Sequence, residues 1–340
     1  MWKRKTKFRI IMSYSVYKIF TNLQRKESNV NDCFSAASLP FSTKHKIGIS
    51  SEGYPIFFIE CNTKENSLDI NLEFISVMFN RICRLKEDDS TFSENTYTII
   101  SLKTENIDLQ QYFLEVVCII LEQLPESPTH KQLKSEIQKL IDLFSRFTRP
   151  PKKTIQGLWA EMFIIDQAKY PEYLIQSWHA SPEDKFDFND GQDKIEVKST
   201  SQTRRIHSFA FEQLNPNRNS NLLIASVFVV QTGRGKNIFD LRNSICKKVT
   251  NLQLQFRLNE LLSQTLGSDF DKVFDVYFDY QQAIDTLSFF DFKDIPTISG
   301  DNIPNEISNV RFDCDLSRVR TIKDKIFDTS HSPLFRSIQL

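Results

Sequence analysis

The sequence predicts an α/β fold with a mixed central sheet, preceded by a β-rich and helical region and followed by further strands. After residue 150 a helical pattern is followed by short strands, a continuous apolar run at 222–231 and further helices, an order typical of α/β domains. Arg149-Pro150-Pro151 interrupts the chain, since proline cannot continue a helix. We therefore predict an accessory region at 1–150, a core at 151–270, and C-terminal strands at 271–340 that pack on the core.

In the accessory region the sequence predicts strands first and helices second. Two β-like runs at 45–61 flank a turn signal at 52–55, and further apolar, β-branched runs follow at 68–85 and 96–102. Apolar residues then recur every three or four positions at 108–124 and 133–147, which predicts two amphipathic helices.

The core predicts a helix at 154–169, for which Thr154 is a suitable N-cap. Short strands are expected at 185–189 and 194–200, and 206–211 fits either a strand or a helix start. The run 222–231 suits a strand buried on both faces. Residues 238–266 predict one or two helices, and 273–292 and 310–316 predict terminal strands.

Composition excludes several classes of protein. Basic and acidic residues balance at 43 each, which excludes a histone-like polycation but still allows separate charged patches. Only 8 glycines are present, and none form a Walker or dinucleotide-binding loop. The six cysteines include no CxxC pair, which is typical of reduced thiols in a cytoplasmic protein. No run of eighteen apolar residues occurs, so no membrane span is expected.

The N-terminus carries a cluster of basic residues. Residues 1–26 contain eight lysines and arginines and no acid, and Met12 is an alternative start to Met1. This pattern fits a frayed tail or an arm that contacts nucleic acid.

The segment 186–200 concentrates the polar chemistry. A tight turn at Gly191-Gln192 between two short strands would place Asn189 opposite Lys194 and Asp187 opposite Glu196. Side chains alternate along a strand. We expect one face to carry Asp187, Glu196 and Lys198, and the other to bury Phe186, Phe188, Ile195 and Val197.

Two carboxylates opposed across a hairpin repel each other unless a cation lies between them. Hard oxygen ligands favour Mg²⁺ or Mn²⁺, and Lys198 would share their face. The alternative is an exposed hairpin with a cross-strand ion pair. Two other acid-x-Lys tripeptides occur, at 183–185 in a polar loop and at 291–293 on a possible strand. Only the tripeptide at 196–198 has a turn-linked Asp.

The helix at 154–169 adds another carboxylate. Glu161 falls at the edge of its apolar stripe, beside the small residues Gly157 and Ala168. A carboxylate there is accessible to a neighbouring sheet, although a solvated helix position would show the same pattern.

The pattern Asp…Glu-x-Lys resembles the active site of PD-(D/E)XK nucleases, the restriction-endonuclease-like superfamily. A narrower likeness is to PD-(D/E)XK motif proteins from bacterial restriction-modification and phage-defence neighbourhoods. It covers about residues 150–230, and one position differs, because Phe186 precedes Asp187 where proline is usual. The matching segments are Gly157-Leu-Trp-Ala-Glu161, Phe186-Asp-Phe188, Ile195-Glu-Val-Lys-Ser-Thr200, Arg205-Ile-His207 and Glu212-Gln-Leu214.

The resemblance implies a restriction-endonuclease-like core and a metal-dependent DNA endonuclease of the cytoplasm. The alternative is a nuclease-fold DNA-binding subunit that is inactive or needs partners. Mg²⁺, for which Mn²⁺ could substitute, would be held by Asp187, Glu196 and the Val197 carbonyl. Lys198 would orient water, and Glu161 would hold a second cation or the water network. Expected partners are double-stranded DNA and a methyltransferase and ATPase of the same system, and a homodimer is compatible with this scheme.

Positive charge follows the acidic pair. Residues 194–248 contain ten basic and three acidic residues, so a phosphate-binding surface with salt-sensitive DNA affinity is expected. The candidate nucleic-acid-binding residues are Arg204, Arg205, His207 and Gln213. For these four, solvated, structural or helix-capping roles remain alternatives.

Overall fold

The computed structural model describes residues 16–24, 33–62, 67–87, 92–179, 184–216, 220–298, 303–304, 306–322 and 332–338. The predictions for residues 1–15 and for Arg218 lie outside this part. The chain divides into two compact units, Met1–Pro150 with Asn259–Asp271, and Pro151–Leu258 with Lys272–Leu340. Residues 259–271 thus cluster with the first unit, although the sequence pattern assigned them to the core.

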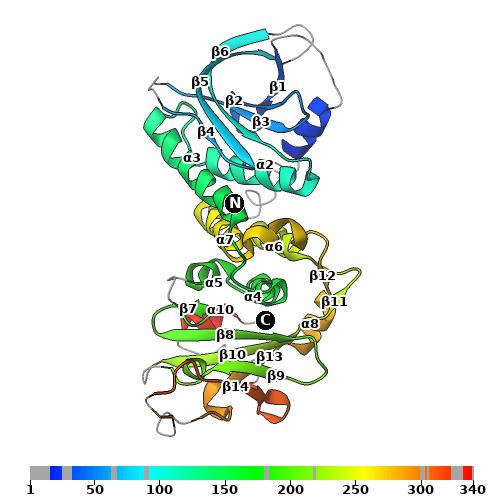
Figure 1. The fold of residues 1–340 in the computed structure, drawn as a ribbon, viewed down its shortest axis with the longest axis vertical. Coiled ribbons are helices and arrows are strands. Elements are labelled where there is room, and N and C mark those ends of the chain that lie inside the picture. Colours follow the sequence, from blue (N-terminus) through cyan, green and yellow to red (C-terminus); the bar gives the residue numbers. More distant parts are fainter. Residues whose placement is uncertain are drawn as a thin grey trace. The chain divides into compact units, whose positions relative to one another are not determined.

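The first unit contains a sheet that closes on itself. Its order is β1-β2-β3-β6-β5-β4, and β1 also pairs with β5 in parallel, which joins five of the strands into a barrel (Figure 1). Phe57 and Phe58 are fully buried on its middle strand. The strands are β1 (Phe34–Leu39), β2 (Ser42–Ile49), β3 (Pro55–Glu60), β4 (Ile70–Asn71), β5 (Ile75–Lys86) and β6 (Phe92–Leu102).

Two helices follow this sheet, as the periodicity predicts. They are α2 (Ile107–Leu121) and α3 (His130–Phe144), capped by the side chains of Asn106 and Thr129. Phe113 of α2 packs against Phe57 of the sheet, with ring centroids 5.7 Å apart. A 3-10 turn, η1 (Ser145–Thr148), then leads to the proline pair.

The second unit is built on a four-stranded mixed sheet of order β13-β10-β8-β7. The strands β8 and β10 are parallel, whereas β7 pairs with β8 and β13 pairs with β10 in antiparallel fashion. The central strand β10 is buried along most of its length, as its apolar run predicts. The strands are β7 (Phe188–Asn189), β8 (Asp193–Thr200), β10 (Asn221–Phe228) and β13 (Ser288–Asp291).

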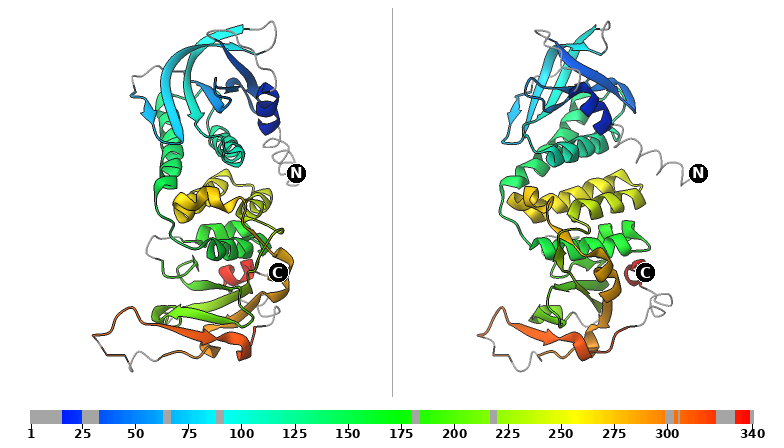
Figure 2. Two further views of the ribbon diagram at one scale, coloured as in Figure 1. Left: turned by 45° about the vertical axis from the view of Figure 1, so that its right-hand side comes forward. Right: turned by 90° about the vertical axis from the view of Figure 1, so that its right-hand side faces the viewer.

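The two faces of this sheet are covered differently (Figures 1 and 2). On one face α4 (Ile155–Gln167) lies against β8, with α5 (Pro171–Ser177) and α6 (Ile238–Lys248) beside it. On the other lies a ribbon of β9 (Ile206–Ala210) and β14 (Arg311–Asp315). Between sheet and ribbon is a core that includes Phe209, Ile224 and Phe290. The sheet is therefore enclosed between helices and a second β layer.

The helix α4 is held firmly at both its start and its middle. The Thr154 hydroxyl accepts a hydrogen bond from the Gly157 N–H at 3.1 Å, which caps the helix as expected. The indole of Trp159 stacks on Phe163 and donates from Nε1 to the Lys236 carbonyl at 2.9 Å. These contacts fix the rotation of α4, and with it the direction in which Glu161 points.

Several shorter elements complete the chain. After α6 come α7 (Leu252–Leu266), η3 (Gly267–Val273) and the short strand β12 (Tyr277–Phe278). A two-stranded pairing joins β11 (Gln231–Thr232) to β12 (Tyr277–Phe278). The chain ends its described part in α10 (Pro333–Ser337). Within the described residues, no helix is long and apolar enough to cross a membrane.

The C-terminal prediction of strands at 273–292 is wrong in part. Residues 280–286 form a helix, α8 (Tyr280–Thr286), whose first turn is capped by the Asp279 side chain. Short apolar segments do not distinguish helix from strand by periodicity alone. The strand β13 that follows is an integral edge of the central sheet rather than an extension of it. The strand predicted at 185–189 also shortens, to Phe188–Asn189.

Gly235 is predicted to be the least replaceable glycine of the second unit. Its φ is +136°, and an added Cβ would lie 2.1 Å from the Phe278 carbonyl oxygen. Gly235→Ala should therefore lower the free energy of unfolding by about 2 kcal/mol or more. Gly233→Ala is the control, because no atom lies within 4 Å of its added Cβ. Equal stabilities of the two variants in urea titrations would contradict this prediction.

Candidate active site

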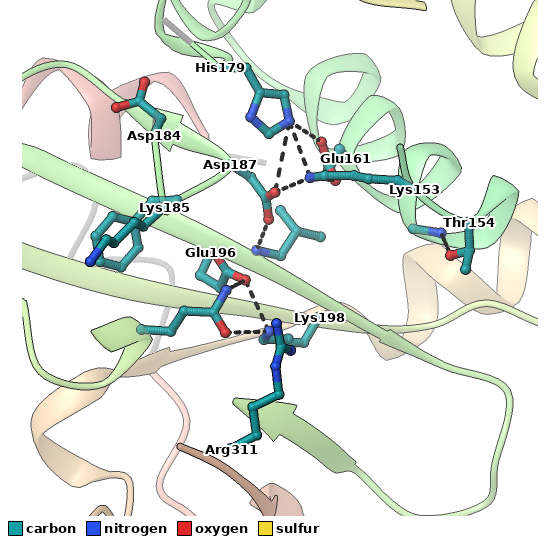
Figure 3. A pocket seen from close by; sticks show the side chains of 14 residues that line it. Lys153, Thr154, Glu161, His179, Asp184, Lys185, Asp187, Glu196, Lys198 and Arg311 are labelled. Atoms are coloured by element: carbon teal, nitrogen blue, oxygen red, sulfur yellow. Dashed lines mark hydrogen bonds and ion pairs between the residues drawn. The ribbon is translucent and has the colours of Figure 1, made fainter. Parts of the chain in front are cut away.

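A pocket of about 470 Å³ opens in the second unit where α4, the segment before β7, and β8 meet (Figure 3). It contains most of the residues that the sequence singled out. The lining residues are Lys153, Thr154, Gly157, Glu161, His179, Asp184, Lys185, Phe186, Asp187, Glu196, Val197, Lys198, Gln213 and Arg311.

Glu161 projects from α4 into this pocket and is only 3% exposed. Its Oε2 accepts a hydrogen bond from Trp178 Nε1 at 2.8 Å and lies 3.0 Å from His179 Nε2. Its Oε1 lies 2.6 Å from the ammonium of Lys153. The prediction that this carboxylate faces the sheet rather than solvent is therefore met by the geometry.

Asp187 lies beside the edge of β8, where β7 no longer covers it, and is 6% exposed. Its Oδ2 accepts a hydrogen bond from the backbone N–H of Val197 at 2.8 Å. Its Oδ1 lies 2.6 Å from Lys153 Nζ. Because the N–H and carbonyl of an extended residue point to the same side, the Val197 carbonyl also faces this edge.

Glu196 and Lys198 project from the same face of β8, opposite the face that carries the Val197 side chain. Lys198 Nζ lies 3.0 Å from Glu196 Oε1 and 2.9 Å from Gln213 Oε1. The Gln213 side-chain amide, on η2 (Phe211–Gln213), also donates to Glu196 Oε1. Gln213 is itself fixed by the Ala210 N–H, which donates to its Oε1 at 3.0 Å. One glutamine thus orients both the carboxylate and the lysine.

The carboxyl groups of Asp187 and Glu196 titrate differently. Burial and then the nearby Asp187 charge raise the pKa of Glu196 to about 8, despite the opposing effect of Lys198. Burial also acts to raise the pKa of Asp187, but Lys153, the Val197 N–H and His179 outweigh it and lower that pKa. Asp187 is therefore the ionised member of the pair, and Glu196 is the one that a further cation would stabilise.

One atom of the pocket has its hydrogen-bonding capacity unused. Glu196 Oε2 is buried and has no hydrogen-bond partner, which is costly for a carboxylate oxygen. Asp187 Oδ2 and the Val197 carbonyl face the same edge of β8. These oxygen donors fit a hard divalent ion. Separately, ligand atoms of Glu161, His179 and Asp187 all lie within 4.8 Å of one another, so the protein has a buried group that could bind a metal.

The hairpin register is confirmed at Asn189, but Asp187 lies outside the strand and does not pair with Glu196, and the predicted division of side chains between the faces is not met. Asn189 pairs with Lys194 and Phe188 with Ile195. Phe186, however, packs in the core on the ribbon side and lies under Lys194 Nζ, on the same face as Glu196. The strand begins at Phe188, so alternation does not extend to 186 and 187. Val197 is half-buried in the pocket wall rather than in the core.

Three of the four predicted nucleic-acid-binding residues do not line the pocket. Arg204 is paired with Asp315. Arg205 donates to the Ser226 carbonyl and hydroxyl at 2.9 and 2.7 Å and lies over the Phe228 ring. His207 is buried, with Nε2 2.8 Å from Ser226 Oγ. Gln213 alone is brought to the pocket.

The basic run at 194–248 does not form one surface. Lys194 is buried and donates to Ser220 Oγ at 2.7 Å. Lys236 and Lys248 both pair with the fully buried Asp166. Lys194 is thus buried, whereas Lys236 and Lys248 remain partly exposed while they neutralise a buried carboxylate.

Lys153, His179 and Arg311 belong to the pocket, yet no sequence pattern indicated them. Lys153 precedes the N-cap of α4, and Arg311 comes from β14, more than a hundred residues after the motif. His179 has no partner at metal-ligand spacing in the sequence, so spacing alone gives no sign of its place in the pocket. The rival tripeptide at 291–293 lies elsewhere, and Asp291 caps the 3-10 turn η4 (Phe292–Asp294).

A mixed sheet that carries Glu196 and Lys198 on β8, with Asp187 beside its edge, is consistent with an α/β nuclease-like fold. The chain belongs to the family described as "Putative PD-(D/E)XK family member, (DUF4420)", whose model matches residues 16–317. This confirms the resemblance found in the motif and extends it well beyond residues 150–230. No significant match was found among curated proteins or solved structures.

His207 is predicted to act on stability rather than on DNA binding. Burial, and then the charges of Lys198 and Arg205, lower its pKa to about 4, whereas an unfolded histidine titrates near 6.5. Between pH 6.5 and 4, His207 therefore binds a proton in the unfolded chain but not in the folded chain. The contribution of His207 to the free energy of unfolding is therefore fully present above about pH 6.5. It is lost as the pH decreases towards 4, by at most about 3 kcal/mol.

Urea unfolding of wild type and His207→Asn between pH 7 and 4 measures this contribution. The variant should lose part of the pH dependence, while His45, whose pKa burial also lowers to about 4, maintains the rest. An unchanged pH dependence together with weakened DNA binding would instead favour the phosphate-contact role.

Proposed function

We propose that this protein is a Mg²⁺-dependent DNA endonuclease with a restriction-endonuclease-like core, acting in the cytoplasm as part of a restriction or phage-defence system. Mn²⁺ is expected to substitute. The observation that carries the proposal is the buried, unpartnered Glu196 Oε2 beside Asp187, with Lys198 3.0 Å from the other Glu196 oxygen. Glu196 Oε2 accepts no hydrogen bond from the described residues, so this oxygen is available to a metal ion.

The residues that would hold the ion are Asp187, Glu196 and the Val197 carbonyl. When bound, a divalent ion supplies a Lewis acid for the phosphodiester and lowers the pKa of bound water. Asp187 is already oriented for this role, because Val197 N–H holds one oxygen and Lys153 holds the other. Binding of the ion would favour the ionised form of Glu196, whose pKa is raised without it.

Lys198 would orient the attacking water and offset the negative charge that develops on the phosphoryl group in the transition state. Its position is defined by Glu196 on one side and Gln213 on the other, so the ammonium is held before substrate arrives. Arg311 lines the same pocket and would contact the phosphate backbone. Specificity for a DNA sequence is not encoded in these contacts, since phosphate contacts position a duplex without reading its bases.

Removing the Lys198 ammonium should abolish most cleavage and leave DNA binding largely intact. We expect Lys198→Met to reduce the rate of plasmid nicking in Mg²⁺ by about 10²–10³-fold, because its interaction matters mainly in the transition state. Glu196→Gln, which keeps the shape but removes the metal ligand's charge, should also be inactive. Cleavage rates and gel-shift affinities measured on the same preparations separate the two effects.

The matched control is Asp291→Asn in the rival tripeptide, where the carboxylate caps a 3-10 turn outside the pocket. It should cleave like wild type. Loss of cleavage in Asp291→Asn with full activity in Lys198→Met would relocate the site. Wild type that binds DNA and Mg²⁺ but cleaves only with proteins encoded beside it, such as a methyltransferase or ATPase, would identify the conditional subunit.

A further inference from the structure

The ammonium of Lys153 lies at the centre of the group formed by Glu161, His179 and Asp187. Its Nζ is 2.6 Å from Glu161 Oε1, 2.6 Å from Asp187 Oδ1 and 3.2 Å from His179 Nε2. Figure 3 shows these four side chains converging on one point from α4, from the segment before it, and from the segment between α5 and β7. The ligand atoms that could hold a metal ion there are thus already arranged around a cation of the chain itself.

This group and the Asp187–Glu196 edge are two adjacent cation positions that share Asp187. Two-metal hydrolases use pairs of ions about 3.5–4 Å apart that share a carboxylate in this way. Here the two positions differ in one respect. The oxygens of Glu161 have donors from Lys153, Trp178 and His179, whereas Glu196 Oε2 has none. At the second position Lys198 contacts Glu196 Oε1 at 3.0 Å, and Glu196 Oε2 is left without a donor.

The charge of the pocket supports the same reading. Glu161 and Asp187 are both buried, and two unpaired carboxylates at this depth would be strongly destabilising. Lys153 supplies the compensating positive charge, because its Nζ lies 2.6 Å from an oxygen of each carboxylate.

We propose that Lys153 is a permanent second cation of the site, so that the protein binds one divalent ion, at Asp187, Glu196 and the Val197 carbonyl, where it would otherwise bind two. The proposal rests on the proposed function in taking that edge as the metal position. It makes Lys153 a positioning residue, which holds Asp187 Oδ1 and leaves Oδ2, with its remaining lone pair, towards the ion.

The test is the number of Mn²⁺ ions bound, measured by calorimetry and by the electron paramagnetic resonance signal of unbound Mn²⁺. Wild type should bind one ion. Lys153→Met should bind two, because Glu161, His179 and Asp187 become free to hold the second. Lys185→Met is the matched control: it removes the same charge from the same pocket, but Lys185 is 3.9 Å from Glu212 and its side chain is 63% exposed. It should bind one.

A measurement on wild type covers the case in which Lys153→Met does not fold without metal. Amine acetylation followed by mass spectrometry reports how accessible the Lys153 ammonium is with and without Mn²⁺. Labelling that is low and unchanged by saturating Mn²⁺ is the expected result. Two ions in wild type, together with a several-fold rise in Lys153 labelling, would show that metal displaces the lysine and would overturn the proposal.

The outcomes separate this inference from the proposed function. If wild type binds no Mn²⁺, there is no metal site, and both proposals are wrong. One ion in wild type that is lost in Glu196→Gln, combined with a single ion in Lys153→Met, would uphold the proposed function and overturn only the role of Lys153.

Discussion

The pocket depends on a single constraint, the compensation of buried carboxylates. Glu161, Asp187 and Glu196 are all nearly inaccessible to water, and burying a charge is unfavourable unless a cation or hydrogen-bond donor is supplied. Lys153 bridges the first two at 2.6 Å each, and Lys198 partners the third at 3.0 Å. The donors come from the residue Lys153 before α4, from β8, from Trp178 after α5 and from Gln213 on η2, so segments far apart in the chain meet at these carboxylates.

The late start of β7 makes this arrangement possible. If β7 began before Phe188, its backbone would pair with Val197 and occupy the edge of β8. Instead the strand begins at Phe188, which also forms a bridge with Trp178, and the Asp187 carboxylate accepts the Val197 N–H in place of a strand partner. The same bridge brings Trp178 and His179 to Glu161. A strand two residues long thus creates both the metal edge and the lysine-bridged group.

The positive charge that follows the motif has mostly an internal role. Arg205 and His207 meet at Ser226 on the central strand β10, and so tie the ribbon β9 to the sheet. Lys236 and Lys248 neutralise Asp166 at the far end of α4 from the cap. A cluster of basic residues along a chain predicts a charged surface only if the fold leaves those residues on one side, and here strand alternation and helix packing distribute them between core and surface.

Local patterns determined much of this protein. The period of apolar residues predicted α2, α3 and α4, the apolar run predicted the buried strand β10, and the turn at Gly191 set the register that pairs Asn189 with Lys194. Asp187, Glu196 and Lys198 were identified from opposed carboxylates across the predicted hairpin and from the motif they resemble, and Glu161 from its place at the edge of the apolar stripe of its helix. Only tertiary structure could place Phe186 with the ribbon, turn 280–286 into a helix, and bring Lys153, His179 and Arg311 into the pocket. Those positions depend on contacts between segments far apart in the chain, which no local period or spacing records.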